Sequence, residues 1–151
     1  MIDKNKIQIF TDGACKGNPG IGGWGVLIKY PKISDELKGF QTQTTNNRME
    51  LIAVIEGLKS IKEGKRIEII TDSKYVKNGI NEWIFNWKNN GWRTAAKKAV
   101  KNKDLWQTLD DLVQQFSIDW KWVKGHSGNP GNERADQLAN EAILEFYDKN
   151  S

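Results

Sequence analysis

At 151 residues, of which 38% are hydrophobic, the chain is long enough for one domain with a buried core, and nothing in its composition marks a linker. A single cysteine excludes an internal disulfide and favours a reducing compartment. No stretch approaches 18 apolar residues, and residues 1–6 lack the apolar core of a signal peptide. We therefore expect a cytoplasmic monomer without a membrane segment.

The net charge of +4 is unevenly distributed along the chain. Residues 74–103 contain eight Lys or Arg against one acid, a net charge of +7, which leaves 15 basic against 18 acidic residues elsewhere, or −3. This asymmetry predicts one basic patch on an otherwise slightly acidic body.

The expected elements begin with a strand over residues 6–12, whose Ile-x-Ile-x-Thr-Asp hexapeptide recurs at residues 67–72. Each copy predicts a buried strand that ends at an aspartate, Asp12 or Asp72. Either aspartate could simply begin a turn. If the strands are parallel neighbours, the two carboxylates lie within about 5 Å at one sheet edge, where their repulsion favours a bound cation.

Glycines follow the first strand, and the pattern G-x-G-x-x-G occurs at Gly20, Gly22 and Gly25. Residues 24–30 then predict a strand rather than a helix start, which argues against a dinucleotide site, and no Lys-Ser or Lys-Thr completes a P-loop. A third short strand is expected over residues 38–44. The short connections predict that the first three strands form an antiparallel meander.

A helix capped by Asn46 or Asn47 and stopped by Gly64 is expected next, because apolar residues recur at helical spacing between residues 49 and 61. Glu50 borders this apolar stripe in the first turn. Such an acid could serve the helix dipole alone or point back towards the sheet. The helix leads into the second hexapeptide by a right-handed crossover, which makes the fourth strand parallel to the first.

The basic segment begins after the second hexapeptide. Residues 75–88 predict a helix whose stripe includes Trp83 and Trp87, and Trp92 follows with a run of lysines. Tryptophans interleaved with cations suit a polyanion whose sugars or bases stack and whose phosphates need neutralising. A solvated charge run is the alternative interpretation.

The last third of the chain predicts two helices and a strand. Residues 103–116 form an amphipathic helix with Asp110 and Asp111 facing water, and residues 118–122 form the fifth strand. A glycine-rich turn carries the only histidine, His126, and we expect Asn132 to cap the final helix. Asp136 in its first turn borders the apolar face as Glu50 does, and could likewise serve the dipole alone.

These expectations bring four carboxylates together: two at neighbouring strand ends and two in the first turns of helices. Oxygen ligands without a Cys or His cluster favour Mg²⁺ or Mn²⁺ over zinc. His126, close to Asp136 in the sequence, could handle protons near neutral pH.

Several separated motifs of the chain resemble those of bacterial type 1 ribonuclease H, in the right order and over nearly the whole length. They are Ile9-Phe10-Thr11-Asp12-Gly13, Gly17-Asn18-Pro19-Gly20, Thr44-Thr45-Asn46-Asn47-Arg48-Met49-Glu50-Leu51, Thr71-Asp72-Ser73, Trp122-Val123-Lys124-Gly125-His126 and Asn132-Glu133-Arg134-Ala135-Asp136.

The resemblance implies an α/β, ribonuclease H-like fold with a five-stranded mixed sheet in the order 3-2-1-4-5 and helices on both faces. One catalytic domain would span residues 1–151, with a basic handle at about 88–103. The implied activity is endonucleolytic cleavage of the RNA strand of RNA/DNA hybrids by two-metal-ion hydrolysis, leaving a 5′-phosphate and a 3′-hydroxyl. Two Mg²⁺ ions, or Mn²⁺ as a substitute, would be held by Asp12, Glu50, Asp72 and Asp136.

The resemblance also implies roles for residues around these acids. His126 would assist proton transfer or product release. Residues that would touch the RNA strand near its 2′-hydroxyls are Cys15, Asn18, Asn46 and Asn47. Contacts to the DNA strand would come from Trp83 and Trp87 on deoxyribose, and from Thr45 and Asn102 on a phosphate. The handle would add Trp92, Lys97, Lys98 and Lys101.

Three positions depart from the most basic relatives: Gln43 stands where some members place an arginine, and Asn89 and Asn90 occupy handle positions that are often basic. Fewer phosphate contacts would weaken hybrid binding and flatten its salt dependence. Two other interpretations stay open. A non-catalytic nucleic-acid-binding module would not need four acids, and a DNA-cutting nuclease of the integrase or transposase kind would not explain the Thr-Thr-Asn-Asn-Arg-Met-Glu run.

Overall fold

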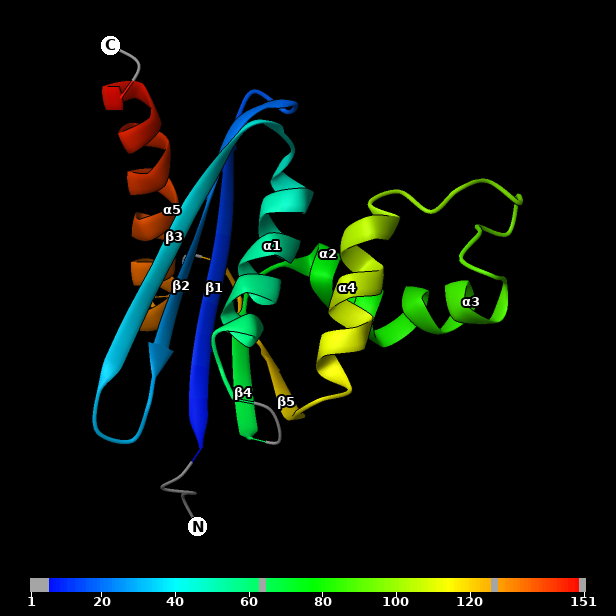
Figure 1. The fold of residues 1–151 in the computed structure, drawn as a ribbon, viewed down its shortest axis with the longest axis horizontal. Helices are drawn as coiled ribbons and strands as arrows, with labels where there is room; N and C mark the ends of the chain where they lie inside the picture. Colours follow the sequence, from blue (N-terminus) through cyan, green and yellow to red (C-terminus); the bar gives the residue numbers. More distant parts are fainter. Residues whose placement is uncertain (1–5, 63–64, 126–127, 150–151) are drawn as a thin grey trace.

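The structure is a computed structural model and describes residues 6–62, 65–125 and 128–149. A five-stranded sheet lies between α5 on one face and α1 on the other (Figure 1). The strands are β1 Ile7–Lys16, β2 Gly20–Lys29, β3 Ser34–Thr44, β4 Arg66–Thr71 and β5 Ser117–Trp122. The helices are α1 Asn46–Lys59, α2 Lys74–Asn78, the π-helical turn η1 Gly79–Trp83, α3 Ile84–Asn89, α4 Lys103–Val113 and α5 Pro130–Lys149.

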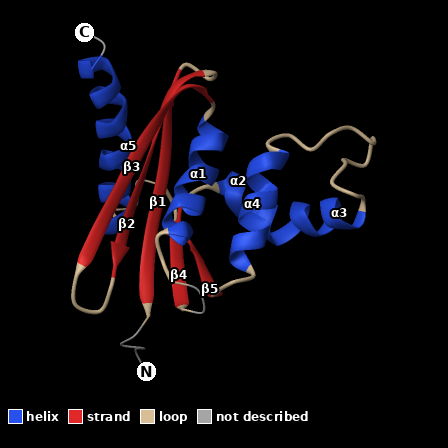
Figure 2. Cartoon of the chain, viewed as in Figure 1, coloured by secondary structure: helices blue, strands red, loops and turns tan. Residues whose placement is uncertain are grey.

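The sheet is mixed, with the strand order β3-β2-β1-β4-β5 (Figure 2). β1, β2 and β3 form an antiparallel meander, while β4 and β5 run parallel to β1. The predicted fold class, strand order and pairing directions are confirmed. β3 begins four residues earlier than predicted, at Ser34, because it pairs with β2 as far as Lys29.

β1 is longer than predicted, and Asp12 does not end it. The parallel pairing with β4 stops at Phe10, but the antiparallel pairing with β2 continues through Asp12 to Lys16. The glycine-rich stretch therefore extends the strand instead of turning away from it. Asp12 lies where the parallel ladder ends, whereas Asp72 directly follows the last residue of β4.

The N-terminus of α1 is capped by Thr45, not by Asn46 or Asn47 as predicted. The Thr45 hydroxyl accepts a hydrogen bond of 3.2 Å from the backbone N–H of Arg48. This arrangement satisfies one of the N–H groups that the first turn of a helix leaves without a partner. The helix ends at Lys59, and the predicted stop lies outside the described residues.

α1 lies between the sheet and α4, so it is buried nearly all round. The predicted apolar stripe is confirmed, with Met49, Leu51, Ile52, Val54, Ile55, Leu58 and Ile61 all buried. Glu50 lies in the second turn rather than the first, and only 7% of its surface is exposed. A helix dipole acts on the first turn, so the dipole gives no account of this carboxylate.

The single helix expected over residues 75–88 is broken into three pieces. The π-turn η1 separates α2 from α3. It opens at Gly79, whose backbone lies so close to the buried Trp106 ring that a Cβ there would approach Cη2 to 1.9 Å. Single π-turns inside helices occur frequently at functional sites. Beyond η1, α3 and the following loop project away from the sheet (Figure 1).

On α4, the predicted exposure of Asp110 is wrong. The prediction placed Asp110 and Asp111 in water, and Asp111 is exposed. Asp110 is instead buried, and its Oδ2 lies 3.3 Å from Lys88 Nζ on α3. This ion pair joins α4 to the base of the projecting segment.

α5 begins at Pro130, and Asn129 caps it in place of the predicted Asn132. The Asn129 Oδ1 accepts a hydrogen bond of 3.1 Å from the backbone N–H of Asn132. The Asn132 amide instead donates to the carbonyl of Ile70 at 3.3 Å, which ties the start of α5 to the end of β4. Asp136 consequently lies in the second turn. Within the described ranges, no helix has the length and apolar character needed to cross a membrane.

Trp106→Ala should destabilise the protein by about 3–5 kcal/mol, because it empties a large buried site and removes one of the two side chains, Trp106 and Asn102, that donate to the Tyr75 hydroxyl. Trp106 is fully buried, and its Nε1 lies 3.0 Å from that hydroxyl. Urea unfolding measures the change. Phe85→Ala is the control, since Phe85 is 70% exposed, and it should cost less than about 0.5 kcal/mol. Equal losses would contradict the packing described here.

Candidate metal and nucleic-acid site

Three of the four predicted acids meet at the end of the parallel strands. Asp12 comes from β1, Asp72 follows β4 and Glu50 comes from α1, and one carboxylate oxygen of each lies within 4.8 Å of the others. The close approach of α1 depends on Gly13, because a Cβ at this position would lie only 2.6 Å from the backbone N of Glu50. The predicted gathering of these three carboxylates is confirmed, and their catalytic role stays a prediction.

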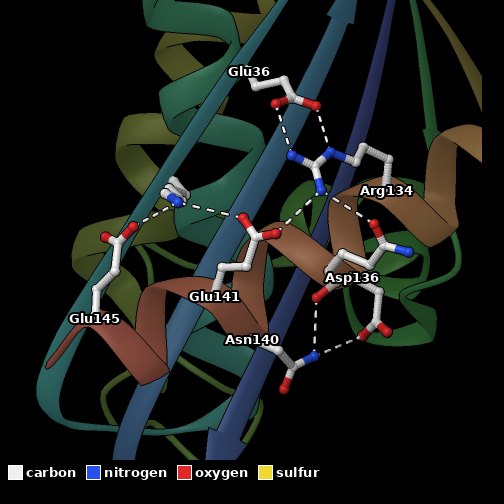
Figure 3. Close-up of polar contacts among 8 residues, drawn as sticks. Glu36, Arg134, Asp136, Asn140, Glu141 and Glu145 are labelled. Carbon is white, nitrogen blue, oxygen red and sulfur yellow. Dashed lines mark hydrogen bonds and ion pairs between the residues drawn. The ribbon is translucent and has the colours of Figure 1, made fainter. Parts of the chain in front are cut away.

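Asp136 approaches the same cluster from α5. Together with Asp12, Asp72, Lys124, Asn129, Asn132 and Glu133 it lines a small cavity of about 30 Å³. Asn140 Nδ2 donates to the Asp136 carbonyl at 2.9 Å and to its carboxylate at 3.3 Å (Figure 3). These bonds fix the orientation of the Asp136 side chain relative to α5.

Ion pairs hold α5, the helix that carries Asp136, against the edge strand β3. Arg134 Nη2 lies 2.9 Å from a carboxylate oxygen of Glu36, and its Nη1 lies 3.2 Å from Glu141 (Figure 3). Lys38 on β3 lies between Glu141 and Glu145, at 3.3 and 2.6 Å. A network of several charges holds a helix better than isolated surface pairs do.

The environment of the acids makes their charged forms costly. Burial raises the pKa of Asp12 to about 8, with further contributions from the Asp72 charge and from a hydrogen bond with Asp136. Burial also raises the pKa of Glu50 well above its ordinary value, and the charges of Asp12 and Asp72 act in the same direction. A cation bound among these carboxylates would oppose both shifts, because it stabilises the charged forms.

The residues present fit a hard divalent cation. Glu50 Oε2 is buried and has no hydrogen-bond partner among the described residues, which is costly for a carboxylate unless an ion binds there. Carboxylate oxygens are the ligands that Mg²⁺ and Mn²⁺ prefer. The predicted partner of this cluster, His126, lies outside the described residues.

A second predicted group lies at the N-terminus of α1. The Asn18 side-chain oxygen accepts a hydrogen bond of 3.0 Å from the backbone N–H of Asn46. The Cys15 thiol lies 3.6 Å from the carbonyl of Thr44, just before the helix cap. The structure thus gathers three of the four residues predicted to touch the RNA strand, and Asn47 follows on the same helix.

Thr45 and Asn102, the predicted phosphate pair, are joined by a residue for which no role was predicted. Arg48 donates its backbone N–H to the Thr45 hydroxyl, and its Nη1 donates to Asn102 Oδ1 at 3.2 Å. Its Nη2 also pairs with Asp104 at 2.8 Å. In the sequence, the position of Arg48 within the Thr-Thr-Asn-Asn-Arg run could have indicated that it belongs to this group.

The predicted tryptophans form a continuous row on the projecting segment. The ring centroids of Trp83 and Trp87 lie 5.9 Å apart, and those of Trp87 and Trp92 lie 6.3 Å apart. Trp87 also packs edge-on against the buried Trp106. The row is half-buried rather than fully exposed, while the side chains of Lys97, Lys98 and Lys101 are exposed to solvent.

Comparison with known proteins identifies the family. The family model for ribonuclease H matches residues 4–144. The chain is 60% identical over 146 residues to the ribonuclease H of Francisella tularensis subsp. novicida, a match that covers 97% of this chain and 96% of that one. This chain belongs to the ribonuclease H family. It is therefore a nuclease, a hydrolase of phosphodiester bonds.

Solved structures of ribonuclease H proteins share the fold. LC9-RNase H1, a type 1 enzyme with the type 2 active-site motif, superposes with a TM-score of 0.85 at 32% identity, covering 96% of this chain and 75% of that one. LC11-RNase H1, solved in complex with an RNA/DNA hybrid, reaches a TM-score of 0.70 at 24% identity and covers 93% and 99%. The second likeness shows the fold alone.

Asp12→Asn should stabilise this ribonuclease H when no metal is present. Because the pKa of Asp12 is raised from 3.8 to about 8, the folded state holds a proton that the unfolded state releases, so stability falls as the pH rises through this interval. The neutral amide avoids this loss. We expect little difference at pH 4 and a gain on the order of 2–4 kcal/mol at pH 8.

Urea unfolding in EDTA at both pH values measures this gain, with Asp111→Asn on the exposed face of α4 as the control. Added Mg²⁺ should stabilise the unaltered protein more than Asp12→Asn, because only the former keeps all the carboxylates. A gain that is the same at pH 4 and pH 8 would contradict the described environment of Asp12.

Proposed function

We propose that the chain cleaves the RNA strand of RNA/DNA hybrids by two-metal-ion hydrolysis, leaving a 5′-phosphate and a 3′-hydroxyl. The observation that carries the proposal is the acidic cluster, with its unpartnered Glu50 oxygen, in a chain with the ribonuclease H fold. Its substrate class is supported by the polar group at the start of α1 and by the fold shared with LC11-RNase H1, which was solved with such a hybrid.

Asp12, Glu50, Asp72 and Asp136 would hold two Mg²⁺ ions, with Mn²⁺ as a substitute. Divalent ions bound there would activate the attacking water and stabilise the leaving 3′-oxygen. Asp12 would be shared between the two ions, which is supported by its proximity to Asp72 and Glu50 and by its hydrogen bond with Asp136. His126 would move a proton or aid product release.

Selection of RNA over DNA would depend on the 2′-hydroxyl of the cleaved strand. Cys15, Asn18, Asn46 and Asn47 would provide donors and acceptors for that group. On the other strand, Trp83 and Trp87 would pack against deoxyribose, where an extra hydroxyl would clash. Thr45 and Asn102, joined by Arg48, would hold a phosphate of that strand.

A cleavage assay with labelled RNA/DNA hybrid, duplex DNA and duplex RNA, each with Mg²⁺ or EDTA, tests the proposal. We expect Mg²⁺-dependent cutting of the RNA strand of the hybrid alone. Asp12→Asn should lower the rate by about 10³-fold or more while hybrid binding persists, because the metal site loses a charged ligand.

The other outcomes separate the alternatives. Equal cutting of duplex DNA would favour an integrase-like or transposase-like nuclease. Binding of the hybrid without any cleavage would favour a non-catalytic nucleic-acid-binding module. Full activity of Asp12→Asn would mean that the metal site lies elsewhere.

Replacing Lys97, Lys98 and Lys101 by alanine should raise KM about tenfold and leave kcat within about twofold, because the handle neutralises phosphates away from the reacting bond. The dependence of KM on salt should also flatten, by about 0.9 in the log–log slope for each phosphate that the handle no longer neutralises. Replacing Lys32, Lys62 and Lys149, which are exposed on other parts of the surface, removes the same charge as a control. An effect confined to kcat would show that the handle acts otherwise.

A further inference from the structure

A groove adjoins the acidic cluster on the side of α2 and β5. It encloses about 390 Å³ and is lined by residues 71–74, Lys77 and residues 122–125. The small cavity that contains Asp12 and Asp136 shares two lining residues with it, Asp72 and Lys124. The groove is therefore a continuation of the acidic site, and no residue of the 88–103 handle lines it.

The charge of the groove is opposite to that of the cluster. Lys74 and Lys77 on α2 and Lys124 after β5 contribute three ammonium groups, against the single carboxylate of Asp72. All three lysines are exposed, and within the described part of the chain none of them forms an ion pair. Unpaired cations converging on one hollow are suited to bind an anion.

The floor of the groove indicates what kind of anion would bind. Thr71 and Trp122 line it together with the lysines, and the Trp122 indole is stacked on Trp120, with centroids 5.1 Å apart and planes 9° from parallel. A stacked indole offers a rigid, half-buried apolar surface next to the cations. Phosphates that alternate with sugars match such a combination better than an isolated inorganic anion does.

We propose that this groove binds phosphate groups of the RNA strand next to the scissile phosphate. This inference rests on the proposed function, because it requires that the RNA strand crosses the acidic cluster. A strand whose scissile phosphate lies at Asp72 must continue past one flank of the cluster, and the groove opens there. The lysines would fix the strand so that the correct phosphate lies over the carboxylates.

The test uses the groove variant Lys74→Ala/Lys77→Ala/Lys124→Ala and the charge-matched control Lys32→Ala/Lys62→Ala/Lys149→Ala. Each is combined with Asp12→Asn, so that hybrid affinity is measured in Mg²⁺ without cleavage. We expect the groove variant to raise Kd about tenfold and the control less than about threefold, because only the former removes cations that bind phosphates. Equal increases in Kd would show a general electrostatic effect and overturn the proposal.

The location of the contact is tested with neutral phosphates. The cleaved position of a short hybrid is first mapped with the unaltered protein. Single methylphosphonates, each with a 2′-deoxynucleotide on its 5′ side, are then placed at successive RNA-strand linkages around it. The same deoxynucleotide with an ordinary phosphate is the control. At one or two linkages beside the scissile bond, the neutral phosphate should weaken binding about fivefold with the groove intact and have little effect on the groove variant.

If the neutral phosphate raises Kd by the same factor in the groove variant as in the protein with an intact groove, at every linkage, the groove does not hold an RNA phosphate. If no RNA-strand linkage is sensitive although the groove variant binds the hybrid more weakly, the proposal is wrong about the strand. Failure of the proposed function itself would be seen separately, as absence of Mg²⁺-dependent cleavage by the unaltered protein.

Discussion

Repulsion among carboxylates is the constraint on which the rest of this structure depends. The parallel pairing of β1 with β4 and the close approach of α1 at Gly13 bring three acids within 4.8 Å of one another. Without metal, burial and the neighbouring charges raise the pKa values of Asp12 and Glu50 and so favour their protonated forms. A cation requires the charged carboxylates, so metal binding and proton binding compete at one place. The packing of the rest of the fold therefore has to offset the unfavourable free energy of this site.

Cations surround this acidic centre in two separate places. The handle carries one set, and its base is held by the Lys88–Asp110 ion pair and by Trp87 against Trp106. The lysines beside Asp72 form the other set. The acids would repel the phosphates of a nucleic acid, whereas the lysines would attract them. The separation of the two groups in space therefore matters more than the net charge of the protein.

Much of the fold could be predicted from the sequence because the strands and helices are encoded by local periodicity. The repeated hexapeptide correctly indicated two parallel strands whose aspartates meet. The failures share a different cause, since each depends on a partner distant in sequence. β1 continues past Asp12 because β2 pairs with it, the helix after β4 changes to a π-turn where Gly79 meets Trp106, and Asp110 is buried by Lys88. No local pattern contains these partners.

The chain order of the four acids has a consequence for synthesis. Asp12 is made early, but Asp136 lies on the last helix of a chain of 151 residues. Domains fold as units, and here α5 packs on β1, β2 and β3, so the same helix that completes the acidic centre also covers one face of the sheet. The group of four acids is therefore assembled only when α5 has docked on the sheet. Loss of α5 would thus remove Asp136 and, at the same time, uncover the apolar face of the sheet on which α5 packs.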